Sequence, residues 1–363
     1  MARSERLNRF IINSVEAHPK DVVRLAAAAF GVSRQTVINH IDRLEREGVV
    51  EAHGRTRARR YGLKTNTWAK TSDVVAPFEE DRVWREQILP YIRDLPENVL
   101  GICNYGCTEM LNNVAEHSES PEVMVRIDRT ALRTQISIGD VGIGIFNKLQ
   151  QACGLDDPRQ ALLELSKGKL TSDPEHHTGE GIFFTSRMFD EFMIISGTSL
   201  FHRTNQDDDQ WLVDLRENPK VDGTIMIMII RNESVATAQE TFDKFASPDD
   251  DYGFSKTHIP IQLALYEGEQ MVSRSQAKRI LARAERFKEV ILDFTGVKEI
   301  GQGFADEVFR VFAKEHPDVN IVPMFTTPEI EKTISRARWG ETVPNEPQQL
   351  SLLSPADAPD SAS

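Results

Sequence analysis

The chain has 363 residues, of which 40% are hydrophobic and 27% are charged, and its formal net charge is −13. This composition is typical of a globular protein of about two to three domains, and no apolar run approaches the ~18 residues that a membrane-spanning helix needs. Charged residues among the first ten positions argue against an export signal, and three cysteines are too few for a disulfide framework. We therefore expect a cytoplasmic protein with no membrane partner.

The positive charge is concentrated at one end of the chain. Residues 1–64 contain 13 Lys and Arg against 7 Asp and Glu, a net charge of +6, whereas the remaining residues carry −19. This asymmetry indicates that only the N-terminal part meets an anionic polymer.

Residues 1–66 have the pattern of three short helices followed by a hairpin. Apolar residues recur at helical spacing over residues 7–15, Asp21 can cap a second helix, and Ser33 can cap a third. Residues 49–52 are predicted to be the first strand of the hairpin. Side chains that suit base edges and phosphates lie on the outer side of the third helix and on the hairpin: Arg34, Gln35, Thr36, Asn39, His40, Arg55, Arg57, Arg59 and Arg60.

A short helix, a turn with glycine, a longer helix and a basic hairpin resemble the winged helix-turn-helix domains of bacterial transcription regulators. The resemblance implies that residues 1–66 bind DNA. The alternative is a small protein-interaction domain whose arginines are only solvated. The combination of positive charge, turn and basic hairpin favours DNA.

Residues 67–95 are predicted to be a linker with one helix. Residues 96–232 then combine a long helix, alternating strands and glycine-rich turns. On the long helix Glu109, Asn113 and His117 recur every four residues, so they share one face, opposite an apolar face.

Three more polar segments follow the long helix in a fixed order. The first continues a predicted strand, the second opens a helix and the third begins the last strand: residues 140–144, 178–183 and 223–224. The spacing of a P-loop is absent.

This ordered set resembles the GHKL (Bergerat) ATPases, the superfamily of gyrase, histidine kinases and mismatch-repair proteins, and most closely the anti-sigma-factor serine kinases. The resemblance implies an α/β-sandwich domain over residues 96–232 that binds ATP and Mg²⁺. It also implies a lid over residues 145–178.

The side chains suggest how the two ligands would be held. Asn113 offers an oxygen to Mg²⁺, and Glu109, one helical turn earlier, is the predicted catalytic residue that orients or deprotonates an attacking group. The resemblance implies that Asp140 accepts a hydrogen bond from the adenine amino group. The other predicted ATP-binding residues are Gly142, Gly144, Gly179 and Gly181, where backbone approaches the nucleotide, Thr224, which acts through water, and Lys167 and Lys169, which reach the triphosphate from the lid.

Cys103 and Cys107 could be imagined as metal ligands together with His117. No fourth ligand stands at a zinc-like spacing, so we expect two buried thiols and a structural role for His117.

The rest of the chain divides into an acidic connector over residues 233–252 and a small α/β unit over residues 253–340. In this unit a buried strand, a turn and an amphipathic helix over residues 288–309 resemble the STAS-like domains related to anti-sigma-factor antagonists. The phosphorylated members have a serine at the start of that helix, whereas residues 301–303 of this chain are Gly, Gln and Gly. We therefore expect a docking surface for a protein partner rather than a phosphorylation switch.

The last segment, residues 341–363, has the composition of a disordered tail. Within it the stretch from Gln349 to Leu353 resembles the short motif with which bacterial proteins bind the replication sliding clamp. The clamp is thus a candidate partner.

The sequence as a whole predicts a multidomain α/β chain with a winged helix-turn-helix domain, a Bergerat ATP-binding domain and a STAS-like domain. The leading interpretation is an ATP-responsive DNA-binding regulator, in which the nucleotide changes how the STAS-like domain docks and so controls the winged head. The alternatives are a serine/threonine protein kinase that acts in trans and a slow conformational ATPase. The sequence also leaves room for a homodimer.

Overall fold

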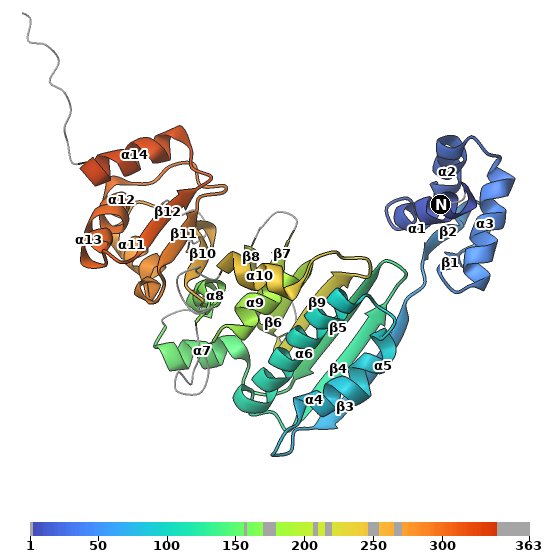
Figure 1. The fold of residues 1–363 in the computed structure, drawn as a ribbon, viewed down its shortest axis with the longest axis horizontal. Helices are drawn as coiled ribbons and strands as arrows, with labels where there is room; N and C mark the ends of the chain where they lie inside the picture. Colours follow the sequence, from blue (N-terminus) through green and yellow to red (C-terminus); the bar gives the residue numbers. More distant parts are fainter. Residues whose placement is uncertain are drawn as a thin grey trace, which may run out of the picture.

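The structure, a computed structural model, describes residues 3–155, 158–169, 179–205, 210–214, 220–245, 254–264 and 271–339. Figure 1 shows three units in chain order, with the N-terminal and C-terminal units attached on opposite sides of the central one. The expected mixed α/β organisation is confirmed.

The N-terminal unit packs three helices against a two-stranded antiparallel hairpin. Helix α2 ends at Gly31, which has a left-handed φ of 61°, and Ser33 caps α3 as expected because its Oγ accepts the Thr36 N–H at 3.1 Å. The core of this unit, which includes Ile11 and Val37, is separate from the core of the rest of the chain. The elements are α1 (Arg3–Ser14), α2 (Val22–Phe30), α3 (Arg34–Arg46), β1 (Val50–His53), the short η1 (Thr56–Ala58) and β2 (Arg60–Leu63).

The central unit is a seven-stranded antiparallel sheet in the order β3-β4-β5-β9-β6-β7-β8. One covered face is expected to give alternating burial along each strand, and in β4 Val123, Val125 and Ile127 are buried between exposed neighbours. The strands are β3 (Asn66–Asp73), β4 (Glu122–Arg129), β5 (Arg133–Asp140), β6 (Glu191–Gly197), β7 (Ser199–Thr204), β8 (Gln210–Asp214) and β9 (Val221–Arg231).

Helices cover one face of this sheet (Figure 1). The covering set comprises the run α4 (Glu80–Val83), η2 (Trp84–Ile88) and α5 (Leu89–Ile92), then α6 (Glu97–His117), α9 (Gly181–Met188) and α10 (Ala238–Phe245). Two further helices, α7 (Ile145–Cys153) and α8 (Pro158–Lys167), fall in the expected lid. None of the described helices is long and apolar enough to cross a membrane.

Two expected boundaries differ from the structure. The segment 67–95 is not a linker, because β3 pairs with β4 over its whole length and the ring centroids of Trp68 and Tyr91 lie 4.6 Å apart. The expected connector 233–252 contains α10, whose Phe242 packs edge-on against Tyr105 of α6. Residues 246–252 lie outside the described residues.

The C-terminal unit is a parallel three-stranded sheet with helical crossovers. Parallel neighbours need such connections, and here the strand order β10-β11-β12 follows the sequence. The strands are β10 (Lys256–Pro260), β11 (Glu289–Asp293) and β12 (Asn320–Met324). The helical elements are η3 (Ile261–Ala264), α11 (Arg274–Leu281), η4 (Ala284–Arg286), the continuous run α12 (Gln302–Asp306), η5 (Glu307–Phe312) and α13 (Ala313–Glu315), and α14 (Pro328–Trp339).

Candidate functional site

The candidate site begins with the two faces of α6. Met110 and Val114 are buried in the core, whereas Glu109, Asn113 and His117 are half-buried on the other face. At 1.5 Å per residue, Glu109 and His117 are separated by ~12 Å along the helix axis. The predicted polar face therefore exists as a strip of half-buried side chains.

Asp140 is the last residue of β5, and it is buried, with 7% of the residue exposed. Burial raises the pKa of Asp140 above its ordinary value, and backbone hydrogen bonds from Gly142 and Thr224 partly oppose that effect. The Gly142 N–H donates to Oδ1 at 2.8 Å. Thr224 is the partner of Asp140 in the β5–β9 register, and its Oγ1 accepts the Ile145 N–H at 3.0 Å, at the start of α7.

The turn after Asp140 is fixed to the C-terminal end of α6. The Ile143 N–H donates to the Ser118 carbonyl at 2.9 Å. A Cβ on Gly142 would lie 1.9 Å from that same carbonyl oxygen, and Gly144 has a left-handed φ of 81° with Ser196 Oγ 2.6 Å from an added Cβ. Only glycine fits at either position, so the expected close backbone approach is made here by the protein itself.

The start of α9 lies against Glu109. A Cβ on Gly181 would lie 2.0 Å from Glu109 Oε2, and Gly179, two residues earlier, has a left-handed φ of 70°. The structure thus brings Glu109, the glycine segment at α9 and the turn after Asp140 to a single helix, with Asn113 between them. No described group of three or more His, Cys, Asp or Glu side chains is arranged to hold a metal.

Lys167 is found away from this strip, contrary to the expectation for the lid. It is 1% exposed, and its Nζ donates to Glu164 Oε1 at 2.5 Å and to the Ala282 carbonyl at 2.9 Å. Arg283 donates to the other oxygen of Glu164 at 3.1 Å. Burial lowers the pKa of Lys167, and the Glu164 carboxylate opposes that shift. The expectation that Lys167 reaches the triphosphate therefore does not agree with this structure.

Lys169 also faces the C-terminal unit. Its Nζ donates to the Arg286 carbonyl at 3.1 Å and lies 4.9 Å from the centroid of the Phe287 ring. The end of α8 and the residues after it thus pack against the C-terminal unit, and neither lysine reaches along α6 toward Asn113.

A stack of phenyl rings joins α9 to the C-terminal unit. Phe183 of α9 lies 4.4 Å from Phe254, and Phe254 lies 5.4 Å from Phe287, measured between ring centroids. Gly168 is left-handed at φ 78°, and a Cβ there would meet both Phe254 and Phe183 at under 3 Å. The two units therefore share one packed core.

Cys103 and Cys107 are buried in α6 as expected. Burial raises the pKa of Cys103 to about 12 and that of Cys107 well above its ordinary value, so neither thiol is a ready nucleophile. His117 is half-buried, and its backbone carbonyl accepts the Lys148 ammonium at 2.7 Å.

The predicted DNA-contacting side chains divide into two groups. Arg34, Gln35, Asn39, Arg55 and Arg60 are exposed. The Gln35 amide donates to Asn39 Oδ1 at 3.0 Å, which holds both side chains on the outer face of α3.

The second group is engaged within the unit. His40 shares a hydrogen bond of 2.6 Å with Asn8 of α1, and the Thr36 hydroxyl lies 2.9 Å from that of Ser33. Arg59 lies 3.6 Å from Glu45 and 4.0 Å from Asp42. The Arg57 side chain lies outside the described residues.

The sequence reasoning missed a buried pair in the C-terminal unit. His258 Nε2 lies 3.0 Å from Asp293 Oδ2, and the Thr295 N–H donates to the other oxygen at 2.8 Å. Burial alone would raise the pKa of Asp293, but these hydrogen bonds lower it below its ordinary value. The partners are 35 residues apart in the sequence, so no local motif predicts the pair.

The glycines at residues 301–303 have a packing explanation. The Gly301 N–H donates to the Met271 carbonyl at 2.6 Å, and a Cβ on Gly301 would lie 2.7 Å from Val272 Cα. A serine at this position has no room. The absence of a hydroxyl at Gly301 thus follows from the approach of the neighbouring segment.

Comparison with known proteins identifies one part of the chain. Residues 276–331 match the family described as "STAS-like domain of unknown function (DUF4325)". No curated protein matches the chain. The residues from Gln349 to Leu353 and the rest of the predicted tail lie outside the described residues. The expected C-terminal module is confirmed over the matched segment: residues 276–331 are a STAS-like domain.

Proposed function

We propose that the chain is an ATP-responsive DNA-binding regulator. Its central unit binds ATP with Mg²⁺ as a Bergerat-type domain, its N-terminal unit binds DNA as a winged helix-turn-helix, and its STAS-like unit holds the lid of the nucleotide site. The observation that carries this proposal is the meeting of two separate segments, the start of α9 and the turn after Asp140, at α6.

Asp140 supports the adenine end of the site. Its carboxylate already accepts backbone hydrogen bonds from Gly142 and Thr224, and the adenine amino group would be a further donor to it. A carboxylate that is 7% exposed makes a stronger hydrogen bond than one in water, because little solvent competes for it. Thr224 stands beside it in the sheet, where a water can bridge its hydroxyl to the base.

Glu109 and Asn113 support the phosphate end. The Glu109 carboxylate lies at the start of α9, where helix N–H groups favour negative charge. Phosphates would be attracted to the same helix end, and Asn113, one turn further along α6, would supply one oxygen to their magnesium ion. Glu109 would orient the group that attacks the terminal phosphate.

The exposed residues of α3 and the hairpin support DNA binding. Arg34, Gln35 and Asn39 begin a helix of 13 residues, which is the part of a recognition helix that reaches base edges. Arg55 and Arg60 stand on the adjacent hairpin, in position for phosphates.

Helix α9 supports the link between the nucleotide and the C-terminal unit. Its first residue touches Glu109, and two residues later Phe183 stacks on Phe254. A shift of α9 on nucleotide binding would therefore change the packing of the STAS-like unit. ATP hydrolysis and phosphoryl transfer to another protein would both use Glu109. The protein kinase and the slow ATPase therefore stay predictions from the sequence.

Calorimetric titration of ATP·Mg²⁺ into the full chain tests the nucleotide site. We expect saturable binding that Asp140→Ala weakens by at least ~tenfold, the cost of losing a hydrogen bond to a charged group. Asp73→Asn, which changes an exposed carboxylate on β3 of the same unit, should bind as the wild type does. Absence of binding to the wild type, or equal binding to Asp140→Ala, would refute the site.

A further inference from the structure

The central sheet has a second face, on the side away from the covering helices. Successive side chains on a strand point to opposite faces. One set, which includes Val125, Ile136 and Met228, is buried under the helices. The other set is called the open sheet face. Its partly exposed apolar members are Met124, Met193, Ile195, Leu200, Ile225 and Ile227, whereas Ile229, one row further along β9, is buried.

The strand register makes these six residues neighbours. Met124 pairs with Gly139, which pairs with Ile225, and Ile225 pairs with Ile195, the partner of Leu200. One row along, Ile227 lies between Ser137 and Met193. The open sheet face is thus one continuous apolar patch across β4, β5, β9, β6 and β7.

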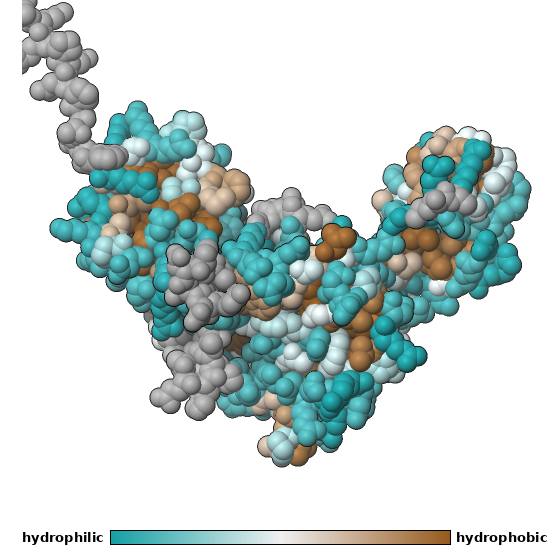
Figure 2. Space-filling model, in the orientation of Figure 1, coloured by the Kyte–Doolittle hydropathy of each residue, from teal (hydrophilic) through white to brown (hydrophobic). Residues whose placement is uncertain are grey.

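This patch is not part of a described core. None of its six apolar members belongs to either hydrophobic cluster of the described residues. Met124 is 39% exposed and the other five are half-buried. Figure 2 shows the helical side of the central unit, where hydrophilic surface is interrupted by several hydrophobic patches.

The N-terminal unit reaches only the margin of the open sheet face. A cavity of about 690 Å³ separates α1 from the strand ends, lined by Asn13 and Glu16 on one side and by Glu191, Ile229 and Arg231 on the other. Ile225, Ile227 and Met193 do not line that cavity. Among the described residues, the N-terminal unit therefore leaves the centre of the patch uncovered.

We propose that a second copy of this chain packs on the open sheet face. The size of the face suits a stable dimer. Seven strands at ~4.8 Å spacing and about six residues at ~3.3 Å make a face of roughly 30 by 20 Å, the order of the ~800 Å² that each partner contributes to a standard interface. Two such faces can pack ~10 Å apart, as in a β-sandwich.

Charge also favours a second copy. The chain carries −13 in total, so most of its surface repels another copy. The open sheet face is balanced, because Arg126 pairs with Asp128 at 2.6 Å and His202 lies 3.7 Å from Glu191.

Sedimentation equilibrium of the full chain over a wide concentration range tests the dimer. We expect the wild type to have twice the monomer mass of 41.0 kDa. Ile227→Lys and Ile195→Lys each place a charge at the centre of the patch and should raise the dimer dissociation constant at least ~tenfold. Val75→Lys, at a residue that is 65% exposed outside the open sheet face, should dimerise as the wild type does.

Circular dichroism and thermal melting identify any variant that fails to fold. If one of the two lysine variants does not fold, the other still tests the dimer. A wild type that is monomeric throughout, or a dimer that persists in both folded lysine variants, would overturn the proposal. This result is independent of the nucleotide titration, because the open sheet face lies on the side of the sheet away from α6.

Discussion

At the scale of single residues, Asp140 combines a cost to stability with a proposed role in binding. The pKa of its carboxyl is raised in the folded protein, chiefly by burial, from an ordinary value of 3.8. Its contribution to stability is therefore fully present below pH 3.8 and is lost as the pH rises through the folded-state pKa. At neutral pH the folded chain holds a charge that burial disfavours.

Asp140→Asn separates these two effects. The amide oxygen can still accept one of the two backbone hydrogen bonds, from Gly142 or Thr224, while the charge is removed. We expect the melting temperature at pH 7 to rise slightly, the gain to disappear below about pH 4, and ATP to bind more weakly because an amide N–H₂ would then face the adenine amino group. Thermal melts at both pH values and calorimetry measure the two effects. A variant that is less stable at pH 7 would contradict the burial account.

Arg34 and Arg59 make a matched pair for the N-terminal unit. Arg34 is exposed, whereas Arg59 is already near Glu45 and Asp42. Arg34→Ala should weaken DNA binding and lower the salt slope by about one, the effect of removing one positive charge from the DNA interface. Arg59→Ala should have a smaller effect on both. Fluorescence anisotropy across a salt series checks this order, and the reverse order would show that the hairpin arginine is the main contact.

At the scale of elements, the docking of α8 against the C-terminal unit depends on a glycine. Gly168 and Gly154 are both left-handed, at φ 78° and 61°, but only an added Cβ at Gly168 meets other atoms, those of Phe254 and Phe183. Gly154→Ala thus measures backbone strain alone, about 1 kcal/mol. Gly168→Ala adds overpacking of the aromatic stack.

We expect Gly168→Ala to cost ~2–3 kcal/mol of unfolding free energy, roughly twice or more the cost of Gly154→Ala. Urea denaturation of both variants gives the difference. Equal losses would mean that the phenyl stack yields to an extra methyl group and does not hold the two units in one arrangement.

The α6 helix could be predicted from sequence because the period of its polar and apolar residues is carried within 21 residues. Strand β3 could not, because it is an edge strand with mostly exposed, polar residues whose partner begins about fifty residues later. The position of the Lys167 side chain could not be predicted for a related reason. Its partner Glu164 is local, but the carbonyls that bind it belong to residues 279 and 282. Long-range pairing of this kind leaves no pattern around the residue itself.

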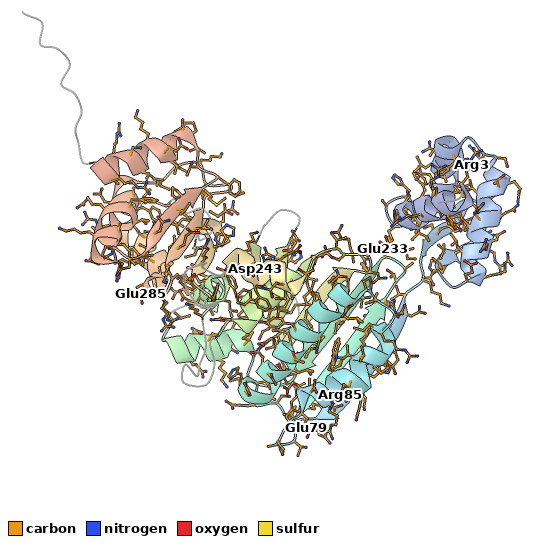
Figure 3. All side chains as sticks on the ribbon, in the orientation of Figure 1. Arg3, Glu79, Arg85, Glu233, Asp243 and Glu285 are labelled. Carbon is orange, nitrogen blue, oxygen red and sulfur yellow. The ribbon has the colours of Figure 1, made fainter. Side chains whose placement is uncertain are left out.

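At the scale of the whole molecule, the two outer units attach at different places. The C-terminal unit packs against α8 and α9. The N-terminal unit lies beside the first residue of β5 and the last residue of β9 (Figure 1). Glu16 lies 3.2 Å from Arg133 at the first residue of β5. Glu233, labelled in Figure 3 just beyond β9, pairs with Arg9 of α1.

This arrangement changes the expected route of control. Asp140 and Thr224 lie at one end of β5 and β9, and Arg133 and Arg231 pair at the other. A nucleotide at Asp140 would therefore reach the N-terminal unit along these two strands rather than through the STAS-like unit. The N-terminal unit has its own core and meets the central unit through a cavity, two ion pairs and the packing of Leu132, so its position can shift without disturbing a shared core.

The most direct measurement is the affinity of the full chain for DNA at fixed salt, with and without saturating ATP·Mg²⁺. If the nucleotide biases the position of the N-terminal unit, the dissociation constant should change by ~5- to 150-fold, the range of ordinary allosteric coupling. Asp140→Ala, at the same nucleotide concentration, should show a much smaller change. Equal DNA affinity in the two conditions, with ATP binding verified by calorimetry, would contradict the account.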